Sequence, residues 1–306
     1  MRNICKHLSL FLIVTILASC SNKQSSEQIQ LKVMSFNIWL GGGKSKEATA
    51  SVIVKSGADI IGIQESMNGD VNVAVLLADS LGFHSYVHKE SRTIISQYPI
   101  KQTSKNGYGV KLKVDDKHFV WMFNIHLMHC PYEPYQLNGI EYCGAPLLNT
   151  AEEAVASAIK TRGEEVKEIL EDILAASKDG LPIFLTGDFN EPSYLDWTKH
   201  AAENGLCKMA VEWPTTKSFS ESAGMKDSYR IIHPNEVVKP GHTWTSIHAP
   251  LPYEEVYDRI DFVLYKGNSV EVVNSEIVGE GAPACDIVIE DYPSDHRAVL
   301  SSFRIK

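Results

Sequence analysis

The chain has 306 residues, of which 44% are hydrophobic and 22% charged, so it can form a sizeable core and lacks the composition of a disordered protein. Asp and Glu total 38 against 29 Lys and Arg, a formal charge of −9 that offers nucleic acid no general attraction. This balance does not exclude a nuclease, because bound divalent cations would offset acids in a site.

The first 19 residues have the pattern of an export signal. Arg2 and Lys6 precede an apolar run at residues 8–17, which is too short to span a bilayer comfortably, and Leu-Ala-Ser then leads into Cys20. This junction resembles the lipobox of bacterial lipoproteins. The resemblance implies that Cys20 becomes a lipidated N-terminus, anchoring the exported chain on the periplasmic or cell-surface face of a bacterial membrane. The alternative, an ordinary cleaved signal with an incidental cysteine, also exports the protein.

Residues 20–30 are polar and lack apolar periodicity, so they predict a flexible tether in front of one domain at residues 31–306. Removal of residues 1–19 takes away Arg2 and Lys6 and no acid. That leaves 27 basic against 38 acidic residues and moves the formal charge from −9 to −11.

Strands and helices are interspersed along the first half of the domain. The sequence predicts a strand at 31–39 that runs into three glycines, a helix at 46–55, a strand at 59–65 and a helix at 70–81. Further strands are predicted at 83–87, 93–96, 107–114 and 118–127. Residues 128–150 have no clear period.

The second half begins with a strongly helical stretch at 151–176, which Asp-Gly-Leu-Pro ends before a strand at 183–186. Other strands are predicted at 242–246, 259–265, 270–278 and 297–305. Polar or acidic residues recur where predicted strands end, which is typical of a site that loops build at a sheet edge. They are Asn37, Glu65, His126, Asp188 and Asn190.

Four cysteines follow Cys20, at positions 130, 143, 207 and 285. Only Cys130 and Cys143 are close in sequence, and an exported chain permits a disulfide between them, which we leave open. Metal ligation by these cysteines is the weaker interpretation, because neither a CxxC nor a Cys/His finger spacing occurs.

Six short strings occur in one order along the domain. They are SFNIW (35–39), IIGIQE (60–65), NIHL (124–127), TGDFNEPS (186–193), RIDFVLY (259–265) and SDHRAVL (294–300). Together they resemble the endonuclease/exonuclease/phosphatase superfamily over nearly the whole domain. The resemblance implies an α/β fold, a four-layer α/β/β/α sandwich in which two mixed β-sheets pack face to face, with a metal-dependent site at one edge. Members cleave phosphoester bonds in substrates that include DNA, RNA, phosphoinositides and sphingomyelin.

The resemblance also implies metal ligands. Glu65 matches the principal ligand of the family, and its oxygens suit Mg²⁺ or Mn²⁺. Asn37 would help to hold that metal or a phosphate oxygen, and Asp295 is a further candidate for the metal sphere. Taken alone, Glu65 would be an ordinary loop acid and Asn37 a cap at the end of a strand.

The same resemblance implies the catalytic residues. Asp188 would orient or deprotonate the attacking water, and Asn190 would donate a hydrogen bond to a phosphoryl oxygen. Asp261 would pair with His296 near the scissile phosphate and fix the tautomer of its ring. His126 would contact phosphate or act as an acid, with His129 as its competitor. In isolation, Asp188 and Asn190 would more simply be turn residues.

The segment 128–150 is longer than a connection to the next helix requires, and it begins just after His126. Its three tyrosines, Tyr132, Tyr135 and Tyr142, are candidates to stack a base or sugar or to contact a choline cation. The equal alternative is a loop with only its own packing. In either case we expect the segment beside the site.

We therefore expect an exported, monomeric, metal-dependent phosphodiesterase or phosphatase that uses water to attack a small or lipid-linked phosphoester. One alternative is a secreted endonuclease or exonuclease on DNA or RNA. The other, an inactive binding protein on the same scaffold, is disfavoured because the motif positions are filled. A covalent Ser or Cys nucleophile is not indicated, since the chain has no G-x-S-x-G elbow.

Overall fold

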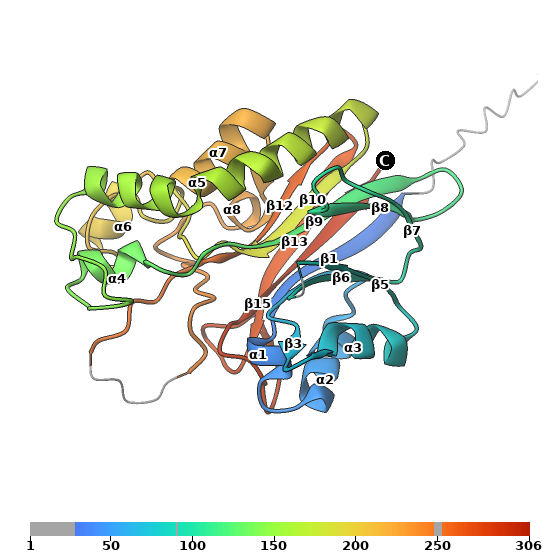
Figure 1. Ribbon diagram of the computed structural model, residues 1–306, viewed down its shortest axis with the longest axis horizontal. Helices are drawn as coiled ribbons and strands as arrows, with labels where there is room; N and C mark the ends of the chain where they lie inside the picture. Colours follow the sequence, from blue (N-terminus) through green and yellow to red (C-terminus); the bar gives the residue numbers. More distant parts are fainter. Residues whose placement is uncertain (1–27, 90, 248–252) are drawn as a thin grey trace, which may run out of the picture.

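The computed structural model describes residues 28–89, 91–247 and 253–306 (Figure 1). The expected signal, Cys20 and residues 20–27 of the expected tether lie outside this range. Strand β1 (Ile29–Asn37) begins two residues inside that tether, and Ile29 pairs with Ile305. In the described part of the chain, no helix combines the length and the apolar character needed to cross a bilayer.

Two mixed sheets form the centre of the molecule. The seven-stranded sheet has the order β14-β13-β15-β1-β2-β6-β5 and the six-stranded sheet the order β11-β12-β10-β9-β8-β7. The first comprises β14 (Ile287–Val288), β13 (Val270–Gly279), β15 (Ala298–Ile305), β1, β2 (Ile60–Gln64), β6 (Arg92–Ser96) and β5 (His84–His88). The second comprises β11 (Lys226–Asp227), β12 (Asp261–Lys266), β10 (Ile183–Asp188), β9 (Phe119–His126), β8 (Gly109–Lys113) and β7 (Ile100–Thr103).

Helices cover the outer face of each sheet (Figure 1). Helices α2 (Lys46–Ser56) and α3 (Val73–Leu81) pack on the seven-stranded sheet, and α5 (Ala151–Ala176) and α7 (Pro214–Ala223) on the six-stranded sheet. The remaining elements are short: α1 (Trp39–Gly42), β3 (Met67–Asn68), β4 (Val71–Asn72), α4 (Glu133–Leu137), η1 (Ser177–Asp179), α6 (Lys199–Glu203) and α8 (Ser228–Ile232). The expected four-layer sandwich is confirmed.

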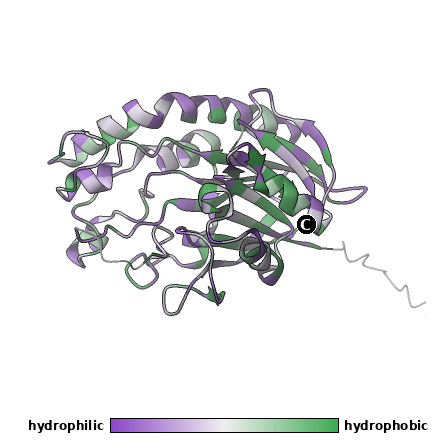
Figure 2. Ribbon diagram, turned by 60° about the horizontal axis from the view of Figure 1, so that its bottom comes forward, coloured by the Kyte–Doolittle hydropathy of each residue, from purple (hydrophilic) through white to green (hydrophobic). Residues whose placement is uncertain are grey.

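The apolar core lies mainly between and against the sheets, where Figure 2 shows the most hydrophobic ribbon. Near the site the packing between the sheets is polar as well. The backbone N–H of Gly187 donates to Ser35 Oγ at 3.0 Å, and Gln64 Nε2 donates to Asn124 Oδ1 at 2.6 Å. A Cβ on Gly62 would lie 1.9 Å from Thr186 Oγ1, so only glycine permits this close approach of the two sheets.

Most predicted elements are confirmed, and α5 has the predicted bounds. Its start is marked by a capping box, in which Thr150 and Glu153 each accept a hydrogen bond from the other's backbone N–H. The predicted strand at 242–246 is wrong. There only Trp244 forms isolated bridges, to Asp258 and His296. The backbone of this segment forms some hydrogen bonds with Asp258 and others with Asp295 and Arg297. Because the bonds are divided between two neighbouring segments, no regular β-ladder forms with either.

Candidate active site

Strand ends from both sheets deliver the expected residues to one edge of the sandwich. Asn37 ends β1, Glu65 directly follows β2, and His126 and Asp188 end the parallel neighbours β9 and β10. Asp261 starts β12 opposite Asp188, because β12 runs antiparallel to β10. Asp295 and His296 directly precede β15.

Asn37 links two of the candidate acids. Its side-chain Nδ2 donates to Glu65 Oε1 and to Asp188 Oδ2, both at 3.0 Å, while Oδ1 accepts from the backbone N–H of Trp39. Asn37 is fully buried, so it lies behind the two carboxylates and does not line the cavity in front of them. Its observed contacts therefore fix the positions of Glu65 and Asp188.

Asp188 is the hub of the site. Its Oδ1 accepts from the backbone N–H of Asn190 at 2.9 Å. Its Oδ2 lies 3.5 Å from His126 Nε2 and 3.7 Å from His296 Nε2. One nearly buried carboxylate thus faces two imidazoles that come from different sheets.

The expected pairing of Asp261 with His296 is present in the structure. His296 Nδ1 lies 2.9 Å from Asp261 Oδ2, which leaves Nε2 directed at Asp188. Burial alone would lower the pKa of His296, but the charges of Asp261 and Asp188 outweigh it and raise that pKa to about 10. At neutral pH His296 is therefore held as a cation and can donate a hydrogen bond from Nε2.

Asn190 and the histidines line the cavity in front of Asp188. Asn190 has a φ of +48° and uses Nδ2 to donate to the backbone oxygen of Leu127 at 3.0 Å, so one amide hydrogen is left for another acceptor. His126 contacts Asp188 directly, whereas His129 is exposed and packs edge-on against Tyr142. Of the two histidines, His126 is the one beside the hub.

The profile of the Endonuclease/Exonuclease/phosphatase family matches residues 34–296. The chain belongs to this family. Its members are phosphoester hydrolases. An uncharacterized protein of Caenorhabditis elegans is 30% identical over 320 residues, covering 96% of this chain and 98% of that protein.

Solved structures share the fold at low sequence identity. An AP endonuclease from Archaeoglobus fulgidus has a TM-score of 0.53 and 12% identity, over 89% of this chain and 98% of that one. The D. rerio TDP2 complexed with a single-strand DNA product has a TM-score of 0.54 and 15% identity, over 90% and 98%. At these identities the likeness concerns the fold alone.

Enzymes of the family generally use divalent metals, and the acids of this site fit such an ion. Burial raises the pKa of Asp295 to about 6; the charge of His296 lowers it, and that of Glu65 raises it. Asp295 Oδ1 is buried and, among the described residues, has no hydrogen-bond partner. A cation held by Glu65 and Asp295 would give Asp295 Oδ1 a partner and would offset the repulsion between the two carboxylates.

A second grouping of possible ligands is Asp188, Asp261 and His296, whose ligand atoms lie within 4.8 Å of one another. We interpret this group as a hydrogen-bonded dyad beside the hub. Asp261 is fully buried and does not line the cavity, and its bond to His296 already uses Nδ1. Glu65 and Asp295 both line the cavity and are therefore accessible to a cation from solvent.

The cavity in front of the hub has a volume of about 630 Å³. It is lined by Glu65, His126, Asp188, Asn190, Asp295 and His296, and on its far part by aromatic rings that include all three tyrosines of the 128–150 segment. None of the described lining residues is Lys or Arg. The segment therefore lies beside the site, as expected from its start after His126.

Tyr132 and Tyr135 are almost completely buried, at 5% and 4% exposure. The Tyr132 hydroxyl donates to Asp258 Oδ2 at 2.7 Å, and the Tyr135 hydroxyl donates to Glu255 Oε1 at 2.6 Å. Tyr142 is half-buried and packs against Tyr135. The two alternatives for this segment are therefore compatible, because Tyr132 and Tyr135 are held by hydrogen bonds within the protein and also line the cavity.

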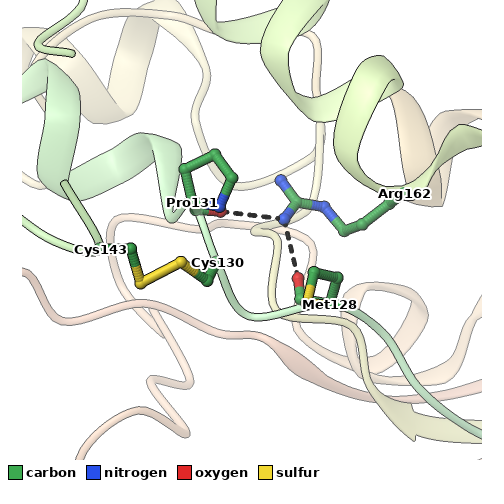
Figure 3. The surroundings of a disulfide bond; sticks show 5 residues. All are labelled: Met128, Cys130, Pro131, Cys143 and Arg162. Atoms are coloured by element: carbon green, nitrogen blue, oxygen red, sulfur yellow. Dashed lines mark hydrogen bonds between the residues drawn. A yellow bond between two sulfur atoms is a disulfide. The ribbon is translucent and has the colours of Figure 1, made fainter. Parts of the chain in front are cut away.

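A disulfide and a buried arginine hold the 128–150 segment in place (Figure 3). Cys130 and Cys143 are joined by a disulfide across a separation of 13 residues. Arg162, on α5, donates from Nη1 to the backbone oxygens of Met128 and Pro131 at 3.0 and 3.3 Å. The start of the segment is therefore anchored to the helix that covers the sheet.

Arg162 also joins this segment to the loop after β10. Its Nε donates to Glu191 Oε2 at 3.0 Å, and its Nη2 pairs with Glu133 Oε2. Glu191 immediately follows Asn190, so one side chain joins the 128–150 segment to the loop that carries Asn190. Arg162 was not among the residues predicted from the sequence. Its signal is a lone charge at position 162 of an apolar i, i+4 stripe of α5 that includes Ala154, Ala158 and Val166.

The contacts of Ser294 and of the Leu40 backbone with residues of the site were also not predicted from the sequence. Ser294 Oγ donates to the backbone oxygen of Asn37 at 2.6 Å and accepts from the N–H of His296 at 3.1 Å, joining the ends of β1 and β15. The backbone N–H of Leu40 donates to Glu65 Oε2 at 2.9 Å. Trp39 and Leu40 both have positive φ, a strained backbone that frequently occurs at functional sites.

Proposed function

We propose that this family member is a divalent-cation-dependent phosphodiesterase or phosphatase that acts on a small or lipid-linked phosphoester. The observation that carries the proposal is the setting of Asp188. Its carboxylate faces the cavity between two imidazoles and is fixed by donors from Asn37 and Asn190. A carboxylate held in this way can accept a proton from an attacking water without reorganising.

The other residues would handle the phosphate. Protonated His296 would donate to a phosphoryl or leaving-group oxygen from Nε2, with Asp261 holding the ring. The free amide hydrogen of Asn190 would donate to a second phosphoryl oxygen. His126 would contact the phosphate from the side of β9. No covalent intermediate is needed, because water is the nucleophile.

Glu65 and Asp295 would hold the cation, which we propose to be Mg²⁺ or Mn²⁺, and Asn37 would keep Glu65 aligned. When bound, such an ion polarises a phosphoryl oxygen and offsets the charge that develops on it. The requirement for oxygen ligands is what favours these two ions over softer metals.

A nuclease is the second candidate, and the likeness in fold to an AP endonuclease and to TDP2 supports considering it. The cavity is poorly suited to a long polynucleotide, because its described lining residues include no Lys or Arg. A polynucleotide would need cationic contacts for the phosphates that flank the scissile one.

We further propose, from the N-terminal pattern alone, that residues 1–19 are removed and that a lipid on Cys20 anchors an exported monomer to a bacterial membrane. Expression of wild type and Cys20→Ala in a bacterial host tests this. The wild-type chain should enter the detergent-soluble membrane fraction at the mass of a lipidated monomer, and Cys20→Ala should not. Equal fractionation of both would contradict the anchor.

A substrate panel tests the hydrolase. The protein is assayed with Mg²⁺, with Mn²⁺ and with EDTA on plasmid, RNA, sphingomyelin, inositol phosphates and a chromogenic phosphodiester, beside Asp188→Ala. Hydrolysis of at least one small or lipid substrate should need both the metal and Asp188. A panel in which neither changes any rate would refute the enzyme and leave an inactive binding protein.

A further inference from the structure

The far part of the cavity is a wall of aromatic rings that is continuous with the catalytic histidine. The wall consists of Tyr132, Tyr135, Tyr142, Trp244 and Tyr253, all of which line the cavity. The Trp244 ring lies 4.9 Å from the His296 ring, and Trp244 Nε1 donates to the Tyr135 hydroxyl at 3.2 Å. A phosphoester bound at His296 would therefore place its organic group against this wall.

The rings of the wall meet at steep angles. Around Tyr135 the rings of Tyr132, Tyr142 and Tyr253 lie at centroid distances of 4.9, 5.6 and 5.7 Å and at interplanar angles of 87°, 84° and 61°. This geometry differs from the parallel faces on which successive nucleobases stack. Rings set steeply to one another instead resemble the sides of a box, the arrangement that binds alkylated ammonium groups.

Carboxylates stand behind the rings. The Tyr135 hydroxyl donates to Glu255, which places negative charge at the edge of this ring and polarises it. The Tyr132 hydroxyl donates to Asp258, whose pKa burial raises to about 7, so the negative charge behind Tyr132 is partial at neutral pH. Among the described residues, the Lys and Arg side chains that lie over aromatic rings do so at Tyr108, Trp121, Tyr229 and Phe262, outside the wall. The cationic ring of His296 contacts the wall at Trp244. The described lining residues of the cavity include no Lys or Arg that would repel a cationic ligand. A cation in the cavity would contact the faces of aromatic rings and would also be attracted by the acidic groups nearby.

We propose that the wall is a subsite for a quaternary ammonium group esterified to the scissile phosphate, as in a choline phosphoester. The proposal rests on the proposed hydrolase function and specifies the substrate class of the same site. Tyr132 and Tyr135 are fixed by their hydrogen bonds, and the disulfide between Cys130 and Cys143 and the contacts of Arg162 hold their segment. Such a wall pays little ordering entropy when its ligand binds.

Two chromogenic diesters of nearly equal shape test the subsite. One is the p-nitrophenyl ester of phosphocholine, and the other is p-nitrophenyl 3,3-dimethylbutyl phosphate, in which carbon replaces the charged nitrogen. The full-length chain is assayed with Mn²⁺ on both diesters and on a single-stranded oligonucleotide. We expect kcat/KM for the phosphocholine ester to exceed that for the 3,3-dimethylbutyl ester by about 10-fold, or about 1.4 kcal/mol, a value between those of an exposed and a desolvated cation–π contact.

Variants of Tyr253 locate the effect, because this ring is the most exposed member of the wall, at 37%. Tyr253→Leu should reduce the ratio of the two kcat/KM values, whereas Tyr253→Phe should retain it. Tyr257→Leu is the matched control, since Tyr257 is equally exposed at 36% but stacks on His242 and does not line the cavity.

The subsite is refuted, with the hydrolase intact, if the wild type hydrolyses both diesters equally in a metal-dependent reaction. It is also refuted if Tyr253→Leu keeps the preference, or if the oligonucleotide has the highest kcat/KM. Absence of metal-dependent hydrolysis of all three probes would instead refute the proposed function, and the subsite with it.

Discussion

Replacement of Arg162 by Met should destabilise the fold severely, because the guanidinium is completely buried between Glu133 and Glu191. Met retains most of the side-chain length but removes the charge and the hydrogen bonds to Met128 and Pro131. Removal of one partner from a buried ion pair costs about 3–5 kcal/mol. The free energy of unfolding of a folded domain is about 5–15 kcal/mol, so this one substitution would remove a large part of it.

Urea denaturation followed by circular dichroism measures the loss of unfolding free energy. The control is Arg304→Met, which breaks an exposed pair with Glu271 and should cost less than about 1 kcal/mol. A triple variant, Arg162→Met with Glu133→Gln and Glu191→Gln, should recover part of the stability because no buried acid is left unpaired. The reasoning is refuted if Arg162→Met costs no more than the control, or if the triple variant is the least stable of all.

Three further changes have defined outcomes. Burial raises the pKa of Asp258 from 3.8 to about 7, so its contribution to stability is full below pH 4 and is lost as the pH rises towards 7. The wild-type free energy of unfolding should therefore decrease between pH 4 and pH 8 by a contribution of the order of 4 kcal/mol from this group. Denaturation curves at the two pH values should show a smaller decrease for Asp258→Asn. Reduction of the disulfide between Cys130 and Cys143 should lower the unfolding free energy by about 2–3 kcal/mol, and a double Ser variant should no longer respond to dithiothreitol. Gly43→Ala should cost about 1–3 kcal/mol in the same assay, because an added Cβ would lie 2.0 Å from the backbone oxygen of Pro293 at a φ of +48°; a loss below 0.5 kcal/mol would contradict that steric argument.

The elements that the sequence predicted well are those with local signals. Helix α5 has a capping box and an apolar stripe, and β10 is an apolar run that ends at Asp188. The short helices α4, α6, α7 and α8 were not predicted. Each has ten residues or fewer, too short to be stable alone, so it forms through tertiary contacts that one-dimensional patterns do not contain.

The candidate site shows the same division. The placement of Asp188 at the end of a strand was predicted from the apolar run before it, whereas Asp261 and His296 were assigned from the resemblance to the family. The position of Asn37 behind the carboxylates could not be anticipated, since it depends on how deeply β1 is buried between its neighbours. The same holds for Arg162, whose guanidinium donates to groups from two segments that are far apart in the sequence.

The metal activation curve of the hydrolase tests the central claim most directly. The rate on a chromogenic phosphodiester is measured against free Mn²⁺ for wild type, Glu65→Gln and Asp188→Asn, with Glu271→Gln as an exposed control. Glu65→Gln should raise the Mn²⁺ concentration for half-maximal rate at least about 10-fold, and Asp188→Asn should lower kcat by about 100-fold or more. Curves that coincide for all four proteins, or a wild-type rate that EDTA leaves unchanged, would contradict the account.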